Sequence, residues 1–583
     1  MSEKTFIKGK DCDLESSIDS MQTKLQNLGV EIDVSAPLNP LPYVYSVHIK
    51  DKNCNLMFTN GKGASQKSTL ASAYGEYFER LSCNYFFADY YLGEKFANDE
   101  FVHYPNEKWF TFEEEMLASE VNGLLDKQLW NYFDPEHELL ASDVFDMNSG
   151  AGERGICALP FECQSDKETV YFPVNIIGNI FVSNGMAAGN TKNEARVQAL
   201  SEIFERYAKN KIIAEGISLP QIPQEVLNRY PHIQESITAL EGHGYHLRIC
   251  DASLGGVYPV ISVTLINPKD GSVLASFGAH PSFEVALERT VTELLQGRTL
   301  DMLDDFFVPS FNSDEVASHE NLEAHFINST GLISYEFFKN SSDFEFVDWD
   351  YDATTQNEFG YLSDIAHKAG FEIYITDYNH LGVYACRMLI PGMSDIYPVL
   401  DLSWSNNNEG AYFREAILSL QNLDYDDIEA LLENFEASEH SDLLRVCEFI
   451  GVSPDANTAW ASLQLGELKA MLNLALQDYS AAKEWVVWIL HMSQLDAQRT
   501  LLYRCLHAML EITLSGKEFL EYKESLVFMY SDEIVHLSED ILDANETFYG
   551  LHSAGLSLEG FVKHQTLLDG YAKVHKAKAM AFK

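Results

Sequence analysis

The sequence predicts an α/β domain followed by an all-α domain, and two observations support this prediction. Three times before residue 300, a β-type run leads through a Gly-rich segment into an amphipathic helix. Proline usage then changes, because Pro454 is the only proline after residue 410. The length of 583 residues and the 46% hydrophobic content allow more than one domain. We therefore expect an α/β domain over residues 1–408 and a helical domain over residues 409–583.

The repeat in the first domain is the most informative part of the chain. Each copy is expected to place a strand, a Gly-rich turn and a helix in that order, so that backbone N–H groups at the helix N-terminus face an anion. The expected strands and the turns that follow them are 56–59 and 60–64, 180–183 and 184–190, and 273–277 and 278–281.

A carboxylate recurs at one position of the three helices, in Glu76, Glu202 and Glu293. Three residues later come Glu79, Glu205 and Gln296, on the same helix face. If the helices converge, these carboxylates need cations, and Mg²⁺ with its preference for oxygen ligands fits them. Nearby arginines could hold phosphate oxygens bidentately, and they are Arg80, Arg206 and Arg289.

Another interpretation of these glutamates is a solvated helix face. A single Glu-x-x-Glu-Arg sequence is usually surface, since charged residues mostly lie outside. Recurrence in register behind three Gly-rich segments favours a site, whereas a duplicated fold could also retain surface glutamates without a role.

The charge of the chain restricts its partners. It has 88 acidic and 40 basic residues, which gives a net charge of −48. Such a surface repels nucleic-acid backbones and anionic lipids, so we expect no nucleic-acid and no membrane partner. No apolar run reaches the roughly 20 residues of a spanning helix. Nine scattered cysteines without a C-x-x-C pair indicate reduced thiols and a cytoplasmic location.

The second domain is expected to consist of short paired helices. Leu465, Leu468, Met471, Leu472 and Ala475 form an apolar stripe at helical spacing, and a second helix starts at residue 479. The small and aromatic residues resemble tetratricopeptide (TPR) repeats, and a plain helical bundle is the alternative. Either arrangement could form a homodimer surface or a protein-docking surface.

Several motifs together resemble the YcaO-domain family, including its stand-alone bacterial members. The resemblance covers nearly the whole chain. The matching segments are 6–10, 59–64, 75–80, 190–196, 202–206, 287–297 and 391–398.

The resemblance implies a YcaO-type ATP-binding domain that uses ATP and Mg²⁺ to phosphorylate a backbone amide of a peptide or protein. It implies Mg²⁺ ligands at Glu76, Glu79, Glu202, Glu205 and Glu293. It also implies nucleotide contacts at Lys10, Ser17, Asn184, Asn190, Glu194, Arg206 and Arg289. Of these, Arg206 and Arg289 would serve catalysis by neutralising phosphate charge.

One departure concerns the end of the chain. Many azoline-forming members end in a Pro-rich tail that organises the site, whereas this chain ends in residues 577–583 without proline. This argues against cyclodehydration of a small peptide. Stand-alone bacterial members are associated with methylthiolation of an aspartate in a small-subunit ribosomal protein, so that protein and its methylthiotransferase become expected partners.

Three other functions fit parts of the sequence. A carboxylate–amine ligase would share the acidic metal cluster but would consume a free carboxylate. A nucleotide-regulated adaptor would act through the helical domain and show no ATP turnover. A metal-buffering acidic protein would need only the carboxylates.

Overall fold

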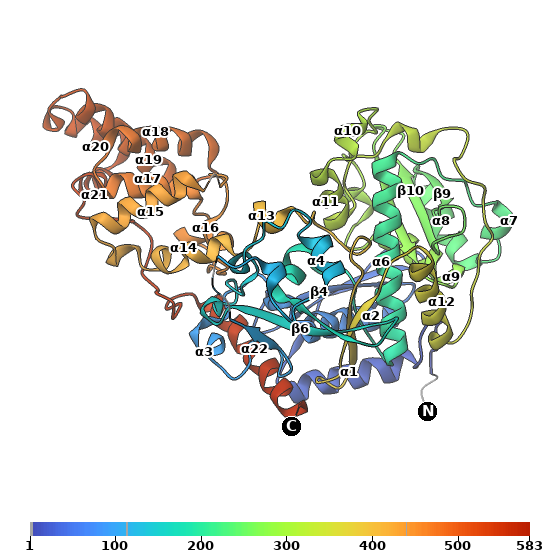
Figure 1. Ribbon diagram of the computed structural model, residues 1–583. Coiled ribbons are helices and arrows are strands. Elements are labelled where there is room, and N and C mark those ends of the chain that lie inside the picture. The colour runs from blue at the N-terminus through green and yellow to red at the C-terminus, as the bar shows by residue number, and fades with distance from the viewer. Residues whose placement is uncertain (1–3, 112, 114, 439, 583) are drawn as a thin grey trace.

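The computed structural model describes residues 4–111, 113, 115–438 and 440–582. Figure 1 shows an α/β region on the right and a purely helical region of later residues on the left. This confirms the predicted fold class, an α/β part followed by a helical part. Within the described residues, no helix is long and apolar enough to cross a membrane.

All strands found among the described residues lie in the α/β region. They are β1 (Ile32–Val34), β2 (Leu38–Leu41), β3 (Val44–Asp51), β4 (Phe58–Gly63), β5 (Lys108–Phe110), β6 (Ile156–Cys163), β7 (Thr169–Pro173), β8 (Met186–Gly189), β9 (His246–Asp251), β10 (Val260–Ile266), β11 (Val273–Ala279), β12 (Tyr374–Tyr378) and β13 (Tyr384–Leu389).

These strands form three antiparallel sheets. In the first, β3 pairs with β1, β2 and β4. The second has the order β11-β10-β9. The third has the order β5-β6-β12-β13-β8, with β7 also paired to β6.

The α/β region also contains helices, several of which pack on these sheets. The helices are α1 (Leu14–Leu28), α2 (Gln66–Ser82), α3 (Gly93–Ala97), α4 (Lys127–Phe133), α5 (Val174–Ile176), α6 (Lys192–Glu215), α7 (Gln224–Leu227), α8 (Pro231–Gly242), α9 (Phe283–Leu294), α10 (Ser313–Val316), α11 (His319–Asn328), α12 (Thr355–Lys368) and α13 (Asp401–Trp404).

The predicted threefold repeat is present as the units β4–α2, β8–α6 and β11–α9. The three helices begin in the same register, because their N-cap residues Ser65, Thr191 and Ser282 stand at equal spacing before the recurring glutamates. Ser65 and Thr191 accept hydrogen bonds from backbone N–H groups of the first helical turn. These caps therefore bind backbone N–H groups at the helix N-termini, which the sequence had predicted to face an anion.

In each unit, glycines that were predicted to lie in a turn lie in the strand, which corrects the prediction, whereas Gly185 does lie in a turn as expected. Gly61 is a residue of β4 and Gly278 of β11. A Cβ on Gly61 would lie 2.1 Å from the Thr69 carbonyl oxygen, and one on Gly278 would lie 2.8 Å from the backbone nitrogen of Thr290. The glycines are therefore required for close packing of each strand on its own helix.

A second correction concerns residues 180–183, which were predicted to form a strand. They follow α5 in a π-helical turn over Ile177–Phe181, and the chain reverses at Val182 with φ of 48°. The strand of this unit, β8, comes instead from the segment predicted as a Gly-rich turn. A short buried apolar run has the same appearance in a helix and in a strand, so periodicity alone could not separate them.

The helical region has its own core. Its helices are α14 (Glu409–Leu418), α15 (Tyr425–Ala437), α16 (Val446–Phe449), α17 (Leu465–Ala475), α18 (Tyr479–Met492), α19 (Ala497–Leu514), α20 (Lys523–Tyr530) and α21 (Asp532–Leu542). The predicted stripe on α17 is confirmed, since Leu465, Leu468, Met471 and Leu472 are buried in this core.

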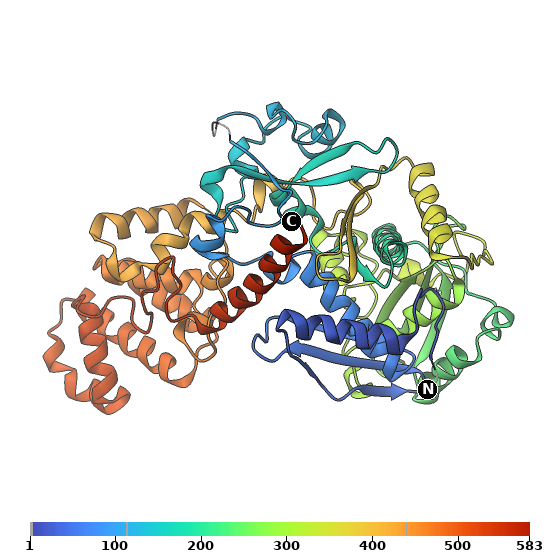
Figure 2. The same ribbon diagram turned by 90° about the horizontal axis from the view of Figure 1, so that it is seen from below.

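The last helix, α22 (Val562–Ala581), leaves the helical region and returns to the α/β region. Figure 2 shows it beside α1, and Lys573 Nζ donates to the Gly29 carbonyl at 2.6 Å. Leu567, Tyr571 and Val574 belong to the same buried cluster as residues of β3 and α2. The two regions are therefore joined by a shared core as well as by the chain.

Because the strand glycines leave no room for a methyl group, Gly61→Ala is expected to destabilise the protein by about 1–3 kcal/mol. Gly360→Ala is a matched control, since nothing lies near its Cβ position on the exposed face of α12 and alanine favours a helix. Thermal unfolding should show a lower midpoint for Gly61→Ala and an equal or higher one for Gly360→Ala. Equal midpoints for both variants would contradict the packing role.

Candidate nucleotide and metal site

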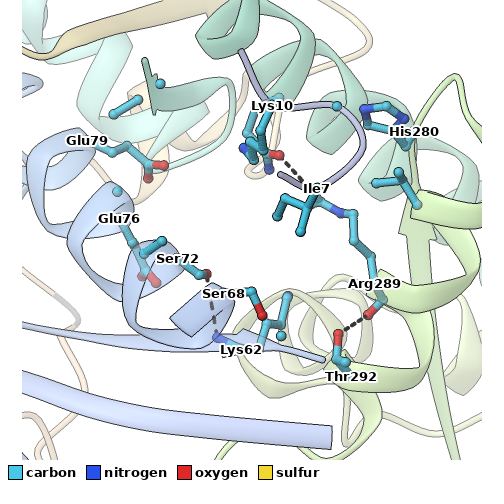
Figure 3. A pocket seen from close by; sticks show the side chains of 18 of the residues that line it. Ile7, Lys10, Lys62, Ser68, Ser72, Glu76, Glu79, His280, Arg289 and Thr292 are labelled. Carbon is cyan, nitrogen blue, oxygen red and sulfur yellow. Dashed lines mark hydrogen bonds between the residues drawn. The ribbon is translucent and has the colours of Figure 1, made fainter. Parts of the chain in front are cut away.

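A cavity of about 1580 Å³ lies where the three repeat helices meet. Its walls come from α1, α2, α6 and α9 and from the N-terminal segment 7–12. Figure 3 shows Glu76 and Glu79 on one side of this space and Arg289 on the other. The cavity is lined by eleven of the twelve predicted site residues, namely Lys10, Ser17, Glu76, Glu79, Asn190, Glu194, Glu202, Glu205, Arg206, Arg289 and Glu293.

The carboxylates of α2 and α6 pair with arginines of their own helix. Arg80 pairs with Glu76 at 3.2 Å and with Glu79 at 3.7 Å, and Arg206 pairs with Glu202 at 2.8 Å. In the third unit, Gln296 replaces the second glutamate and donates to the Asn60 carbonyl at 2.7 Å. It thus links α9 to β4.

Burial and crowding raise the pKa of carboxyl groups in the cavity. Burial raises the pKa of Glu79 well above its usual value, and the charges of Glu202 and Glu76 add to this effect although Arg80 opposes it. Burial also raises the pKa of Glu76. A divalent cation among these oxygens would remove the repulsion, so the donor set fits Mg²⁺.

Two arginines near these carboxylates each have an N–H group without a hydrogen-bond partner in the described structure. Arg206 Nη1 and Arg289 Nε are buried and have no hydrogen-bond partner within the described structure. Arg289 is otherwise held by the side-chain oxygen of Gln198. Buried donors without partners are costly, so both guanidinium groups fit an anion such as a phosphate in the cavity.

The N-terminal segment is fastened to α6 through Glu194. The carboxylate pairs with Lys10 at 3.3 Å and accepts the Asp11 N–H at 2.9 Å. Asn190 donates to the same carboxylate and accepts the Ser17 hydroxyl at 2.8 Å. Burial opposes ionisation, but Lys10 and these donors outweigh it and lower the pKa of Glu194.

Asn184 is the predicted residue that does not line the cavity, and its expected place in the nucleotide pocket is corrected. It is fully buried, and its Nδ2 donates to the Ser394 carbonyl at 2.8 Å. The reason is that Gly185 packs against the Met388 carbonyl, which turns this segment toward β13. Asn184 therefore joins two backbone segments behind the cavity.

Among the cavity residues that the sequence did not single out are Lys62, Gln198, Lys209 and His280. Lys209 lies two turns after Glu202 on α6, so helical spacing alone would have indicated it. His280 packs against Gly9, whose φ is 71°. Burial, with the charges of Arg289 and Lys10, lowers the pKa of His280 to about 3, so its ring is neutral.

The site is thus a cavity that brings together acidic metal-ligand candidates and arginines with unpartnered N–H groups, on three repeated strand–helix units. Such an arrangement defines an α/β protein that binds a phosphorylated ligand with divalent metal. Comparison with known families agrees. Residues 60–394 match the family described as YcaO cyclodehydratase, ATP- and Mg²⁺-binding, and residues 410–580 match the YcaO cyclodehydratase C-terminal domain. The chain belongs to the YcaO family, whose cofactors are ATP and Mg²⁺.

Two relatives match over the full length. The chain is 52% identical over 580 residues to the ribosomal protein S12 methylthiotransferase accessory factor YcaO of Escherichia coli strain K12, covering 99% of each chain. It is 52% identical over 584 residues to an uncharacterised protein of Haemophilus influenzae, also covering 99% of each chain. Among solved structures, YcaO from Methanopyrus kandleri bound with AMPPCP and Mg²⁺ aligns with a TM-score of 0.42 and 14% identity, covering 70% of this chain and 97% of that one.

The raised pKa of Glu79 predicts a pH-dependent effect of Glu79→Gln without ligand. A pKa raised in the folded state costs stability as the pH rises through it, and glutamine removes this cost. We expect the melting temperature of the variant to exceed that of the wild type by about 2–4 °C at pH 8 and by less at pH 5. Glu215→Gln, on the exposed end of α6, is the control. A loss of stability at both pH values would contradict the prediction.

Proposed function

We propose that this protein is an ATP- and Mg²⁺-dependent enzyme that phosphorylates, and so activates, a backbone amide of a peptide or protein. The observation that supports it most is the convergence of carboxylates and of arginines with unpartnered N–H groups in one cavity of a YcaO-family chain. ATP would supply the phosphoryl group and Mg²⁺ would neutralise its charge.

The proposed roles follow from the contacts of each residue. Glu76, Glu79, Glu202, Glu205 and Glu293 would hold Mg²⁺, because they present carboxylate oxygens from three helices to one space. Arg206 and Arg289 would contact phosphate oxygens through their unpartnered N–H groups. Lys10, Ser17, Asn190 and Glu194 would bind the nucleotide from the N-terminal side.

Catalysis at this site would consist of positioning and charge neutralisation. An amide oxygen is a weak nucleophile, so its alignment with the phosphoryl group must supply much of the rate. The paired arginines are oriented before any ligand arrives: Arg206 by Glu202, and Arg289 by Gln198. Preorganised donors of this kind need no rearrangement as charge develops.

In the cell, we propose that the enzyme assists methylthiolation of an aspartate in ribosomal protein S12. The name of the Escherichia coli relative supports this, since that protein is an accessory factor of the S12 methylthiotransferase. The net charge of −48 suits a basic ribosomal protein as partner.

An adaptor role is the second candidate, and the surface of the helical region favours it. Leu520, Phe528 and Met529 are 78%, 94% and 63% exposed at the end of this region. Exposed apolar side chains that lie near one another in the chain can mark a protein contact. ATP turnover above the Mg–ATP background would exclude a purely adaptor role.

Calorimetric ATP titration tests the metal site directly. The wild type should bind ATP only with Mg²⁺, and Glu202→Gln/Glu205→Gln should weaken this binding at least about 100-fold, since two ligand charges are lost. Glu215→Gln is a matched control on the same helix outside the cavity. Equal binding by the double variant and the control would show that these glutamates do not hold the metal.

Complementation tests the catalytic role of Arg289. Deleting the gene should abolish S12 methylthiolation in peptide mass spectra, and wild-type protein should restore it. Arg289→Gln should restore roughly 1% of it or less, as expected for the loss of a transition-state donor. Arg229→Gln removes an exposed arginine that pairs with Asp348 and should restore it fully. Unchanged S12 spectra in the deletion strain would refute the cellular role.

A further inference from the structure

Lys62 provides one of the positive charges in the carboxylate cluster of the cavity. It extends from β4, the strand of the first unit, and its Nζ forms an ion pair with Glu293 of α9 in the third unit. Figure 3 shows Lys62 at the edge of the cavity below Glu76. Its side chain is 23% exposed and that of Glu293 is 32% exposed, so the pair is largely shielded from water.

This ion pair differs in kind from those of the arginines. Arg80 and Arg206 each lie one turn after the glutamate they pair with, so each pair belongs to one helix. The pair of Lys62 joins two units instead. A lysine ammonium is also a compact point charge on a flexible stem, which can leave one carboxylate for another anion more easily than a bidentate guanidinium can.

Burial and the charge of Arg289 oppose a cation at this point, whereas the carboxylates of Glu76, Glu202 and Glu205 attract the ammonium group of Lys62. A metal ion bound to Glu293 would repel Lys62 in the same way as Arg289 does, because two cations cannot share one carboxylate without cost. Lys62 and Mg²⁺ therefore compete for Glu293.

We propose that Lys62 is a resident counter-ion that occupies Glu293 in the nucleotide-free protein and yields this carboxylate to Mg²⁺ when ATP enters. The inference rests on the proposed metal role of Glu293 and adds a rule for the order of binding. The phosphates of ATP bring negative charge, so they can bind the ammonium group of Lys62 and the metal ion at the same time. Mg²⁺ alone binds weakly, and the metal enters with the nucleotide.

Calorimetric titration of MgCl₂ without nucleotide tests this competition. Lys62→Met should bind Mg²⁺ about tenfold more tightly than the wild type, because the competitor is gone. Lys62→Arg keeps the charge and should bind as weakly as the wild type. Lys67→Met is the matched control, since Lys67 forms an inter-element pair with Glu15 at 2.6 Å outside the cavity lining.

The melting temperature gives a second readout that does not depend on activity. In EDTA, Lys62→Met should melt below the wild type, because the carboxylates repel one another, and Mg²⁺ should restore it. If Lys62→Met folds poorly by circular dichroism, Lys62→Gln replaces it in both measurements.

The outcomes separate this inference from the proposed function. Suppose that the wild type binds ATP in the presence of Mg²⁺, but that Lys62→Met binds Mg²⁺ alone no more tightly than the wild type binds it. The counter-ion role is then overturned and the proposed function stands. If the wild type shows no Mg²⁺-dependent ATP binding, both are overturned.

Discussion

The site depends on how closely each repeat strand approaches its own helix. At Gly61 and Gly278, backbone atoms of the following helix occupy the space that a Cβ would need. This contact fixes the helix against the strand, and hydroxyl groups strengthen it: Thr59 donates to the Ala73 carbonyl at 2.9 Å and Ser276 to the Thr290 carbonyl at 2.7 Å. The glutamates that follow at equal spacing then reach one cavity. The geometry of the candidate metal site is thus set by close packing one to two helical turns before the glutamates.

Convergence of like charges has an energetic consequence that shapes the rest of the cavity. Burial raises the pKa of Glu79, and the neighbouring carboxylates of Glu202 and Glu76 raise it further. The chain compensates with cations built into the same units, Arg80 and Arg206 on the helices and Lys62 on the strand. These cations offset part of the repulsion among the carboxylates. Function here requires a local arrangement that is less stable than an apolar one would be.

The sequence predicted the repeat and its helices, and eleven of the twelve site residues that it singled out line the cavity, because register along a helix is a local property. It failed where the outcome depends on contacts between distant segments. A glycine before a helix suggests a turn, but at Gly61 the deciding factor is the neighbouring helix. Asn184 was placed by resemblance, and its burial follows from packing against the segment around Ser394. Residues 180–183 were ambiguous because a short apolar run fits either type of element.

The C-terminal helix shows a dependence that no local pattern indicates. Helix α2 presents Glu76 and Glu79 to the cavity, while the residues between them, Tyr77 and Phe78, are buried in the cluster that contains Tyr571 of α22. Adjacent residues of one helix thus serve the site and the core. Since α22 completes that core, the last segment of the helical region supports the helix that carries the metal-ligand candidates. The C-terminal region is therefore part of the architecture that holds the site, even though its own helices contribute no side chain to the cavity lining within the described structure.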